Sequence, residues 1–171
     1  MCPGAWLTSL SRVAKILWFA ALGNILGGCG FQMQGAFTVP DAMQRTYIEA
    51  EDSRSLFYRT FRRELQAAGV NVVDSSDEAT AIFSIYYDHS SQRVLSVSAR
   101  NVPTEYEVFY TLSYGLMGGD ETLIEVQDMT VVRDYTYDAT LVLGKAKEEE
   151  VIRDALVQDL VRVVLKQISV R

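Results

Sequence analysis

The sequence predicts an α+β fold, a two-layer sandwich in which two helices pack on a mostly antiparallel sheet of about four to five strands. Two segments, one ending before Gly69 and one following Gly144, carry apolar residues three or four positions apart, the spacing of a helix that covers a sheet. The segments between them are rich in β-branched and aromatic residues and alternate apolar with polar positions, which favours strands. The order strand, helix, several strands, helix is typical of an α+β domain.

The first strand is expected at residues 46–50. Asp52 or Ser53 follows as the expected N-cap of the first helix, because a side-chain oxygen at that position accepts a bond from an unpaired backbone N–H group. Gly69 should end this helix, since glycine takes the left-handed C-terminal conformation most readily. The apolar positions of the helix form one stripe: Phe57, Phe61, Leu65 and Ala68.

Several strands are expected after a short extended segment at 70–73 and a polar turn. They are predicted at residues 79–88, 93–99, 106–117 and 122–137. In the third of these strands, alternate residues are expected to form a core face and a wetter face. The core face holds Tyr106, Val108, Tyr110, Leu112, Tyr114 and Leu116, and the wetter face holds Glu105, Glu107, Thr111 and Ser113. Gly118, Gly119 and Asp120 predict a tight hairpin between the last two strands.

Gly144 and Lys145 introduce the longest helix. Residues 148–150 are three glutamates in its first turns, where the helix dipole favours negative charge. Its apolar stripe is expected to be Ile152, Leu156, Leu160, Val164 and Ile168, widened by Ala155, Val161, Val163 and Leu165. This helix should therefore also cover the sheet.

The N-terminus has the features of a bacterial lipoprotein signal peptide. Basic residues precede an apolar run at 16–22, which is shorter than the roughly 20 apolar residues that span a membrane as a helix. The next residues, Leu-Gly-Gly-Cys at 26–29, match the L-x-G-C pattern at which lipoproteins are cut and lipidated. A buried cysteine after a hydrophobic helix is the simpler alternative reading. The order of these features favours a fatty-acyl anchor, palmitate for example, on Cys29.

Three parts follow from this reading: a signal peptide at 1–28, a lipidated tether at 29–40 and a single α+β domain at 41–171. Gly30 stands where an aspartate would favour the inner membrane, so the outer membrane is expected. The other cysteine, Cys2, would leave with the signal peptide, and an internal disulfide is therefore not expected.

Charge excludes one class of partner. The chain carries a net charge of −6, and loss of the two basic residues of the leader leaves −8 on 143 residues. A general nucleic-acid binder would have the opposite sign, so no nucleic-acid partner is expected. An anionic ligand would have to be met by local clusters of basic side chains.

Residues typical of an active site are scarce. His89 is the single histidine and is expected in a polar turn beside Asp88, so neither a catalytic triad nor a multi-histidine metal site can form. The glutamates at 148–150 fit helix-dipole pairing better than acid–base catalysis. Gly115 and Gly118 fit a hairpin and match no phosphate loop. The sequence therefore indicates no enzyme, no cofactor and no metal.

Tyrosines and basic side chains are the remaining candidates for ligand contact. The tyrosines at 106, 110, 114, 135 and 137 suit the core of a sheet better than a ligand surface. Four basic residues are expected at strand ends or a helix start, where they could bind phosphate or remain solvated charges at the rim of a protein contact: Arg93, Arg100, Lys145 and Lys147. The arginines at 54, 59, 62 and 63 are expected to form a solvated helix face.

Several motifs, in a fixed order, carry a resemblance to a known family. They are LGGCGFQMQG at 26–35, Val39 followed by Pro40, LQAAGV at 65–70, Arg100 and Asn101 leading into Thr104, Glu105 and Tyr106, and the closing helix after Lys145. With this spacing the chain resembles the LptE family, the lipopolysaccharide-assembly lipoproteins of the Gram-negative outer membrane. The similarity covers nearly the whole chain after the leader.

The resemblance implies a non-enzymatic role on the periplasmic side of the outer membrane. Such a protein would plug the large β-barrel LptD, help that barrel to fold, and assist insertion of lipopolysaccharide into the outer leaflet. It also implies that Arg100 and Lys145 contact lipopolysaccharide, although Pro103 makes the loop of Arg100 differ from that of some relatives. Because lipopolysaccharide is anionic, the charge of −8 suggests that barrel contact outweighs ligand binding.

Two other functions share the expected anchor. A lipid-anchored envelope enzyme, such as a peptidoglycan hydrolase, would need a catalytic constellation that the sequence does not contain. A generic envelope adaptor would differ in the identity of its partner. Co-purification with a β-barrel and an activity screen would distinguish these alternatives.

Overall fold

The computed structural model describes residues 37–136 and 142–170, with residues 142–146 described by their backbone alone. The elements are η2 (Asp41–Met43), β1 (Arg45–Ala50), α2 (Leu56–Ala67), β2 (Asn71–Val73), η3 (Ser76–Glu78), β3 (Ala81–Val97), β4 (Pro103–Gly118), β5 (Glu121–Thr136) and α3 (Val142–Ile168). The predicted leader, most of the tether with Cys29, and Tyr137 lie outside the described residues.

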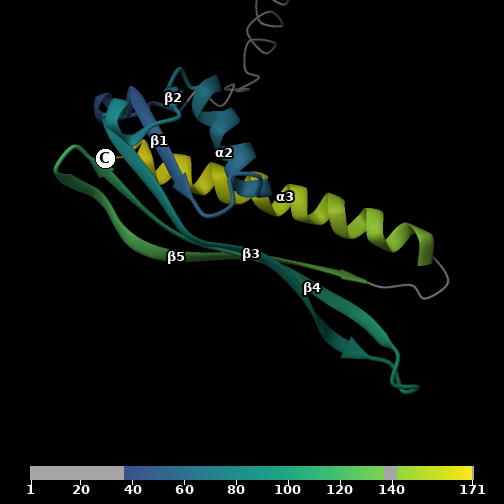
Figure 1. Ribbon diagram of the computed structural model, residues 1–171. Helices are drawn as coiled ribbons and strands as arrows, with labels where there is room; N and C mark the ends of the chain where they lie inside the picture. The colour runs from purple at the N-terminus through teal and green to yellow at the C-terminus, as the bar shows by residue number, and fades with distance from the viewer. Residues whose placement is uncertain (1–36, 137–141, 171) are drawn as a thin grey trace, which may run out of the picture. The chain divides into compact units, whose positions relative to one another are not determined.

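The five strands form one sheet in the order β2-β1-β3-β4-β5, and α2 and α3 lie on the same side of it (Figure 1). β1 pairs in parallel with both β2 and β3, whereas β3–β4 and β4–β5 form long antiparallel ladders. The α+β prediction of two helices on a mostly antiparallel sheet is therefore confirmed. The other face of the sheet carries no helix among the described residues.

The first helix has its predicted core stripe and a different N-cap. Phe57, Phe61 and Leu65 are fully buried, and the chain turns at Gly69 with a φ of 89°. The prediction that Asp52 or Ser53 caps the helix is wrong, because Ser55 Oγ accepts the bond from the Tyr58 N–H at 3.1 Å. Asp52 instead accepts from the Arg54 N–H at 2.8 Å, which closes the turn before the helix.

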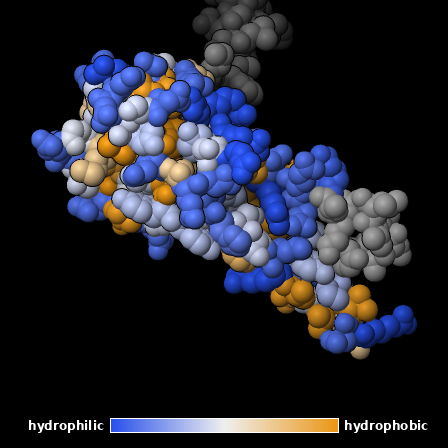
Figure 2. All heavy atoms as spheres, viewed as in Figure 1, coloured by the Kyte–Doolittle hydropathy of each residue, from blue (hydrophilic) through white to orange (hydrophobic). Residues whose placement is uncertain are grey.

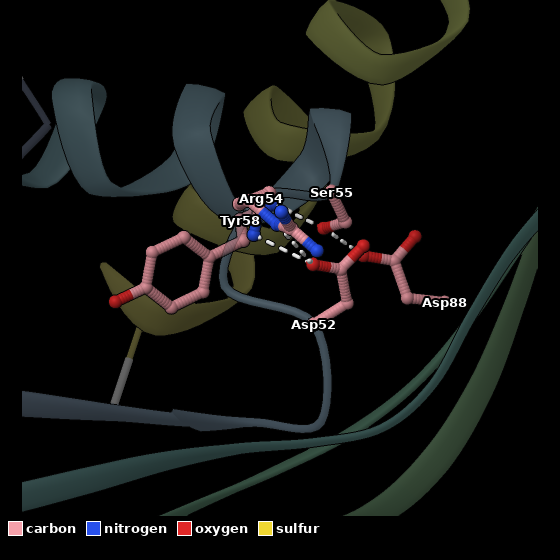
Figure 3. Close-up of polar contacts among 5 residues, drawn as sticks. All are labelled: Asp52, Arg54, Ser55, Tyr58 and Asp88. Atoms are coloured by element: carbon pink, nitrogen blue, oxygen red, sulfur yellow. Dashed lines mark hydrogen bonds and ion pairs between the residues drawn. The ribbon is translucent and has the colours of Figure 1, made fainter.

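The same serine joins the helix to the sheet. Ser55 Oγ donates to a carboxylate oxygen of Asp88 on β3 at 2.5 Å (Figure 3). The other oxygen of Asp88 accepts from the hydroxyl of Tyr110 on β4. Burial and this carboxylate raise the pKa of Tyr110, so its hydroxyl stays protonated and remains a donor. Three elements are thus joined at the N-terminus of α2.

This arrangement predicts that Ser55→Ala lowers the free energy of unfolding by about 1–2 kcal/mol, because it removes the N-cap and one donor to Asp88. Ser53→Ala is the matched control, since Ser53 is exposed and two residues away, and it should change stability by less than about 0.5 kcal/mol. Urea unfolding of both variants measures the difference. Equal losses would reject Ser55 as the cap.

β3 is one continuous strand of 17 residues, where two strands with a turn between them were expected. His89 pairs with Thr111 and Ser91 with Phe109, so the polar stretch stays within the ladder. The register shifts elsewhere, at Tyr86 between Ile85 and Tyr87, and again between Val94 and Val97. Polar residues are tolerated because one face of the sheet has no helix and β4 supplies the backbone partners.

The β4–β5 hairpin agrees with its prediction except at Glu107, which was expected on the wetter face and is buried. Val108, Tyr110, Leu112, Tyr114 and Leu116 are buried, and Tyr106 is partly buried beside them. The turn follows Gly118, and Gly119 has a φ of 60°, which glycine adopts without the steric penalty of a side chain.

The last helix begins at Val142, two residues before the predicted start, and carries the predicted stripe. Ile152, Leu156, Leu160, Val164 and Ile168 are buried, together with Val161 and Leu165. Val163 was expected to join them and is 40% exposed. Four aromatic rings connect the two layers: Phe57 stacks on Phe61, Phe61 contacts Phe83 on β3, and Phe83 stacks on Tyr114 of β4.

Candidate functional site

The β3–β4 hairpin extends past α2 and away from α3, and ends in a tight turn (Figure 1). The Ser98 N–H donates to the Val102 carbonyl at 2.8 Å, and the Asn101 N–H donates to the Ser98 carbonyl at 2.9 Å. Asn101 has a φ of 59°, a left-handed conformation that asparagine tolerates better than most residues. Arg100 is exposed within this turn.

The end of the hairpin, residues 94–104, combines exposed apolar side chains with one positive charge. Val94, Leu95, Val97 and Val102 are 42–53% exposed, and Figure 2 shows hydrophobic residues gathered over this end of the hairpin. Arg100 is its single charged residue, although the chain as a whole is acidic. We call this segment the hairpin tip. Its apolar surface and positive charge suit an anionic amphiphile.

Arg93 lies just before the hairpin tip and is not at a strand end as predicted, because β3 is continuous. Its guanidinium contacts the Glu107 carboxylate at 2.5 Å and lies 5.8 Å from the centre of the Phe109 ring. Glu107 neutralises this charge locally. Arg93 is therefore a weaker candidate for phosphate binding than Arg100.

The other predicted basic positions are at the start of α3. Lys145 is the fourth residue of the helix, in the part described by its backbone. The Lys147 ammonium is exposed and lies 2.9 Å from the Glu150 carboxylate, which raises its pKa. The start of α3 and the β3–β4 turn lie at the same end of the domain (Figure 1). The structure thus brings Arg100 and Lys145 to one end, on separate elements.

The four arginines expected to form a solvated helix face do so only in part, since Arg54 lies before α2 and Arg62 is half-buried. Arg54, Arg59 and Arg63 are exposed. The half-buried Arg62 donates to the Tyr58 hydroxyl at 3.3 Å and to Asp74 at 3.0 Å. These bonds raise the pKa of Arg62, with the bond to Tyr58 contributing most. Arg62 therefore connects α2 to the turn that follows β2.

The tyrosines belong mainly to the core, as predicted. Tyr110, Tyr114 and Tyr135 are buried, and Tyr106 stacks on Tyr135 with ring centres 5.6 Å apart. Burial raises the pKa of Tyr114, and the bond from Gln127 acts in the opposite direction. Each ring fills space between the sheet and the helices, and none of these residues forms a separate ligand surface.

The described residues contain no group of three or more His, Cys, Asp or Glu side chains that could hold a metal ion. His89 is exposed on β3, where its ring lies 6.0 Å from that of Tyr87, so the expected loop position is wrong. Glu149 and Glu150 pair with Arg153 and Lys147 of their own helix. Within residues 37–136 and 142–170, no helix has the length and hydropathy needed to cross a membrane.

Comparison with known proteins decides the family. The family model LptE, described as lipopolysaccharide-assembly, matches residues 43–168, which include both helices and all five strands. This chain belongs to the LptE family. The resemblance seen in the sequence is thereby confirmed, and so is the expected function in lipopolysaccharide assembly, which is a non-enzymatic one.

Individual relatives agree with the LptE assignment. LPS-assembly lipoprotein LptE of Yersinia enterocolitica is 24% identical over 146 residues, which cover 82% of this chain and 70% of the relative. LptE of Yersinia pestis is also 24% identical and covers 84% of this chain and 70% of its own length. The relatives are named lipoproteins, so this LptE-family chain is a lipoprotein of the cell envelope.

Solved structures show the same LptE-family fold. Lipoprotein B of Nitrosomonas europaea superposes with a TM-score of 0.68 at 25% identity, over 82% of this chain and 90% of that one. Rare lipoprotein B of Shewanella oneidensis has a TM-score of 0.65 at 18% identity, over 73% of this chain and 93% of that one, and supports the fold alone.

Arg100 was a candidate from the sequence, whereas the apolar residues around it were missed. The sequence did contain a signal for this segment, because residues 94–104 hold no acidic residue in a chain that has 22 of them. The extension of the hairpin could not be read from the sequence while β3 was divided into two strands. Val94 and Leu95 are exposed because this end of the hairpin extends away from the helices, which the sequence does not reveal.

Proposed function

We propose that this LptE-family protein is anchored by lipid on Cys29 in the outer membrane, facing the periplasm, and that its domain sits in the lumen of an LptD-type β-barrel. There it helps to assemble the barrel and assists the insertion of lipopolysaccharide into the outer leaflet. Arg100 on the hairpin tip and Lys145 at the start of α3 contact lipopolysaccharide. The match of residues 43–168 to the lipopolysaccharide-assembly family carries this proposal.

Three properties of the domain suit a barrel lumen. The fold depends on one hydrophobic core that contains no cysteine among the described residues. The outer surfaces of both helices carry charged side chains, and the lumen of a large barrel is polar and hydrated. The uncovered face of the sheet exposes aromatic and aliphatic anchors, including Tyr86, Tyr87 and Val132, which protein interfaces use to fill pockets.

The hairpin tip suits lipopolysaccharide itself, which joins phosphate groups to acyl chains. An arginine side chain can grip phosphate with two parallel hydrogen bonds. Arg100 has no acidic neighbour within residues 94–104, so no carboxylate of that segment competes for it. Exposed Val97 and Val102 lie on either side of the turn and offer apolar contact. Local charge therefore favours an anionic amphiphile although the whole chain is negative.

Reversing both proposed charges tests the ligand contact. We expect Arg100→Glu with Lys145→Glu to weaken binding of purified lipopolysaccharide by at least about tenfold, because two charge-assisted contacts become repulsive. Arg54→Glu with Arg59→Glu is the matched control, since it changes the net charge equally on exposed positions of the α2 region. Unchanged thermal unfolding would show that both variants are folded. Equal loss of binding in the two variants would reject a specific role for Arg100 and Lys145.

A further inference from the structure

The C-terminal part of α3 lies against β5, the strand at one edge of the sheet. A groove of about 560 Å³ lies between this part of the helix and the first half of β5. Its apolar lining is Leu123 and Ile124 from β5, Val163 from α3 and Val170 just after α3, and its polar lining includes Glu125, Lys166 and Gln167. We call it the edge groove. Val163 is exposed, contrary to its prediction, and lines this groove beside the edge strand β5.

β5 is a long open edge of the sheet. It spans 16 residues and pairs with β4 on one side, and no strand among the described residues pairs with its other side. The opposite edge of the sheet, β2, is three residues long. An exposed edge strand of such length presents a row of backbone N–H and C=O groups that can accept another strand. The edge groove adjoins these groups at residues 122–127.

The charges of β5 disfavour a second copy of this chain and favour a basic partner. β5 carries four exposed carboxylates, on Glu121, Glu125, Asp128 and Asp134, and one arginine. That arginine, Arg133, already contacts Asp159 of α3 at 3.0 Å. Two such edges would bring acidic strands together, which is unfavourable for like charges placed directly opposite.

The pairing register of β5 with β4 also indicates which side chains a partner strand would need on each face of the sheet. Asp128 pairs with Ser113 and Asp134 with Glu107, so both aspartates lie on the face without helices. The edge groove lies on the other face, beneath α3. The β4–β5 register shifts twice between Thr122 and Gln127, and from Gln127 onward the side chains of β5 alternate regularly between the two faces. A strand added along β5 would direct one set of side chains toward the groove and the other set toward the aspartates.

We propose that the edge groove receives an extended segment of a partner protein in which apolar residues alternate with lysine or arginine, and that this segment pairs with β5 as a sixth strand. Its apolar side chains contact Val163, Val170 and Leu123, and its basic side chains face Asp128 and Asp134. None of these residues belongs to the hairpin tip, so this inference stands independently of the proposed lipopolysaccharide contact.

Binding of synthetic peptides tests directly whether β5 accepts a sixth strand. The full lipidated protein in nanodiscs is titrated with an eight-residue peptide that alternates valine and lysine. One comparison peptide carries glutamate in place of lysine, and another carries proline at two central positions, where it cannot donate to a strand ladder. Fluorescence anisotropy reports affinity, and hydrogen–deuterium exchange reports protection of the amides of β5.

The valine–lysine peptide is expected to bind and to slow exchange along residues 121–128, and both comparison peptides are expected to bind at least about tenfold more weakly. Val163→Asp should weaken binding of the valine–lysine peptide about tenfold, because it places a charge among the apolar side chains of the groove. Val151→Asp is the matched control, because Val151 is an exposed valine of α3 outside the groove, and it should leave the affinity unchanged.

Three results would overturn the proposal. The proline peptide could bind as tightly as the valine–lysine peptide, which would exclude strand pairing. The exchange of β5 amides could stay unchanged at saturating peptide, which would place binding elsewhere. The protein without peptide could form dimers that Val163→Asp abolishes, which would make a second copy the occupant of the edge groove.

Discussion

Phe83→Ala should lower the free energy of unfolding by about 3–5 kcal/mol, a large part of the about 5–15 kcal/mol that stabilises a typical domain. Phe83 is fully buried, and its ring contacts Phe61 of α2 at 4.3 Å and Tyr114 of β4 at 5.4 Å between ring centres. Alanine would leave a cavity between the layers and remove both aromatic contacts. Urea unfolding of the purified protein measures the change.

Tyr86→Ala provides the control for Phe83→Ala on the same strand. Tyr86 is 60% exposed on the face without helices, and its loss should cost less than about 0.5 kcal/mol, as is usual at the surface. A loss at Phe83 no larger than that at Tyr86 would mean that the ring contacts do not hold α2 on the sheet.

In cells that lack the LptD-type barrel, Cys29→Ala should move nearly all of the protein from the membrane fraction to the soluble fraction. The predicted acyl chains on Cys29 are the anchor, and more than one chain is needed to make membrane attachment stable rather than marginal. Among the described residues no helix could replace the anchor by crossing the membrane. Cell fractionation followed by immunoblotting measures the distribution, and mass spectrometry of the wild-type N-terminus measures the lipid.

Cys2→Ala is the matched control for the anchor, because it removes the other cysteine of the chain from within the predicted signal peptide. It should leave both membrane association and the mass of the mature protein unchanged. A wild-type N-terminus without lipid would refute the lipidation of Cys29.

The parts of the fold that depend on local periodicity could be predicted from the sequence. Phe57, Phe61 and Leu65 fall on one side of a helix because of their spacing, and each is buried. The alternation in β4 likewise separated the buried Leu112 and Tyr114 from the wetter face. In both cases the pattern extends over enough residues to specify which face meets the core.

The parts that depend on distant residues could not be predicted. The strand β3 continues through Ser90 and Ser91 because β4 lies beside it, and this partner is not visible in the local composition. Ser55 caps α2 rather than Asp52 or Ser53, in a position where Asp88 on another strand also binds it. Such contacts arise only when the chain has folded.

The candidate site likewise has a part that the sequence predicted and a part that it did not. Arg100 was identified from its residue type and the family resemblance, and it lies exposed in a turn as expected. The apolar residues of the hairpin tip became candidates only when the length of β3 was known. The edge groove has no counterpart in the sequence analysis, because Val163 matches the core stripe of α3 and is left exposed only by the position of β5.

Affinity purification from outer membranes tests the central proposal most directly, that this LptE-family protein works inside a β-barrel. The full-length protein with a C-terminal tag is purified from mildly solubilised outer membranes, and stoichiometric partners are identified by mass spectrometry. We expect one large LptD-type β-barrel protein in equal amount with the tagged chain. Recovery of the folded, lipidated chain with no β-barrel partner would contradict the proposal.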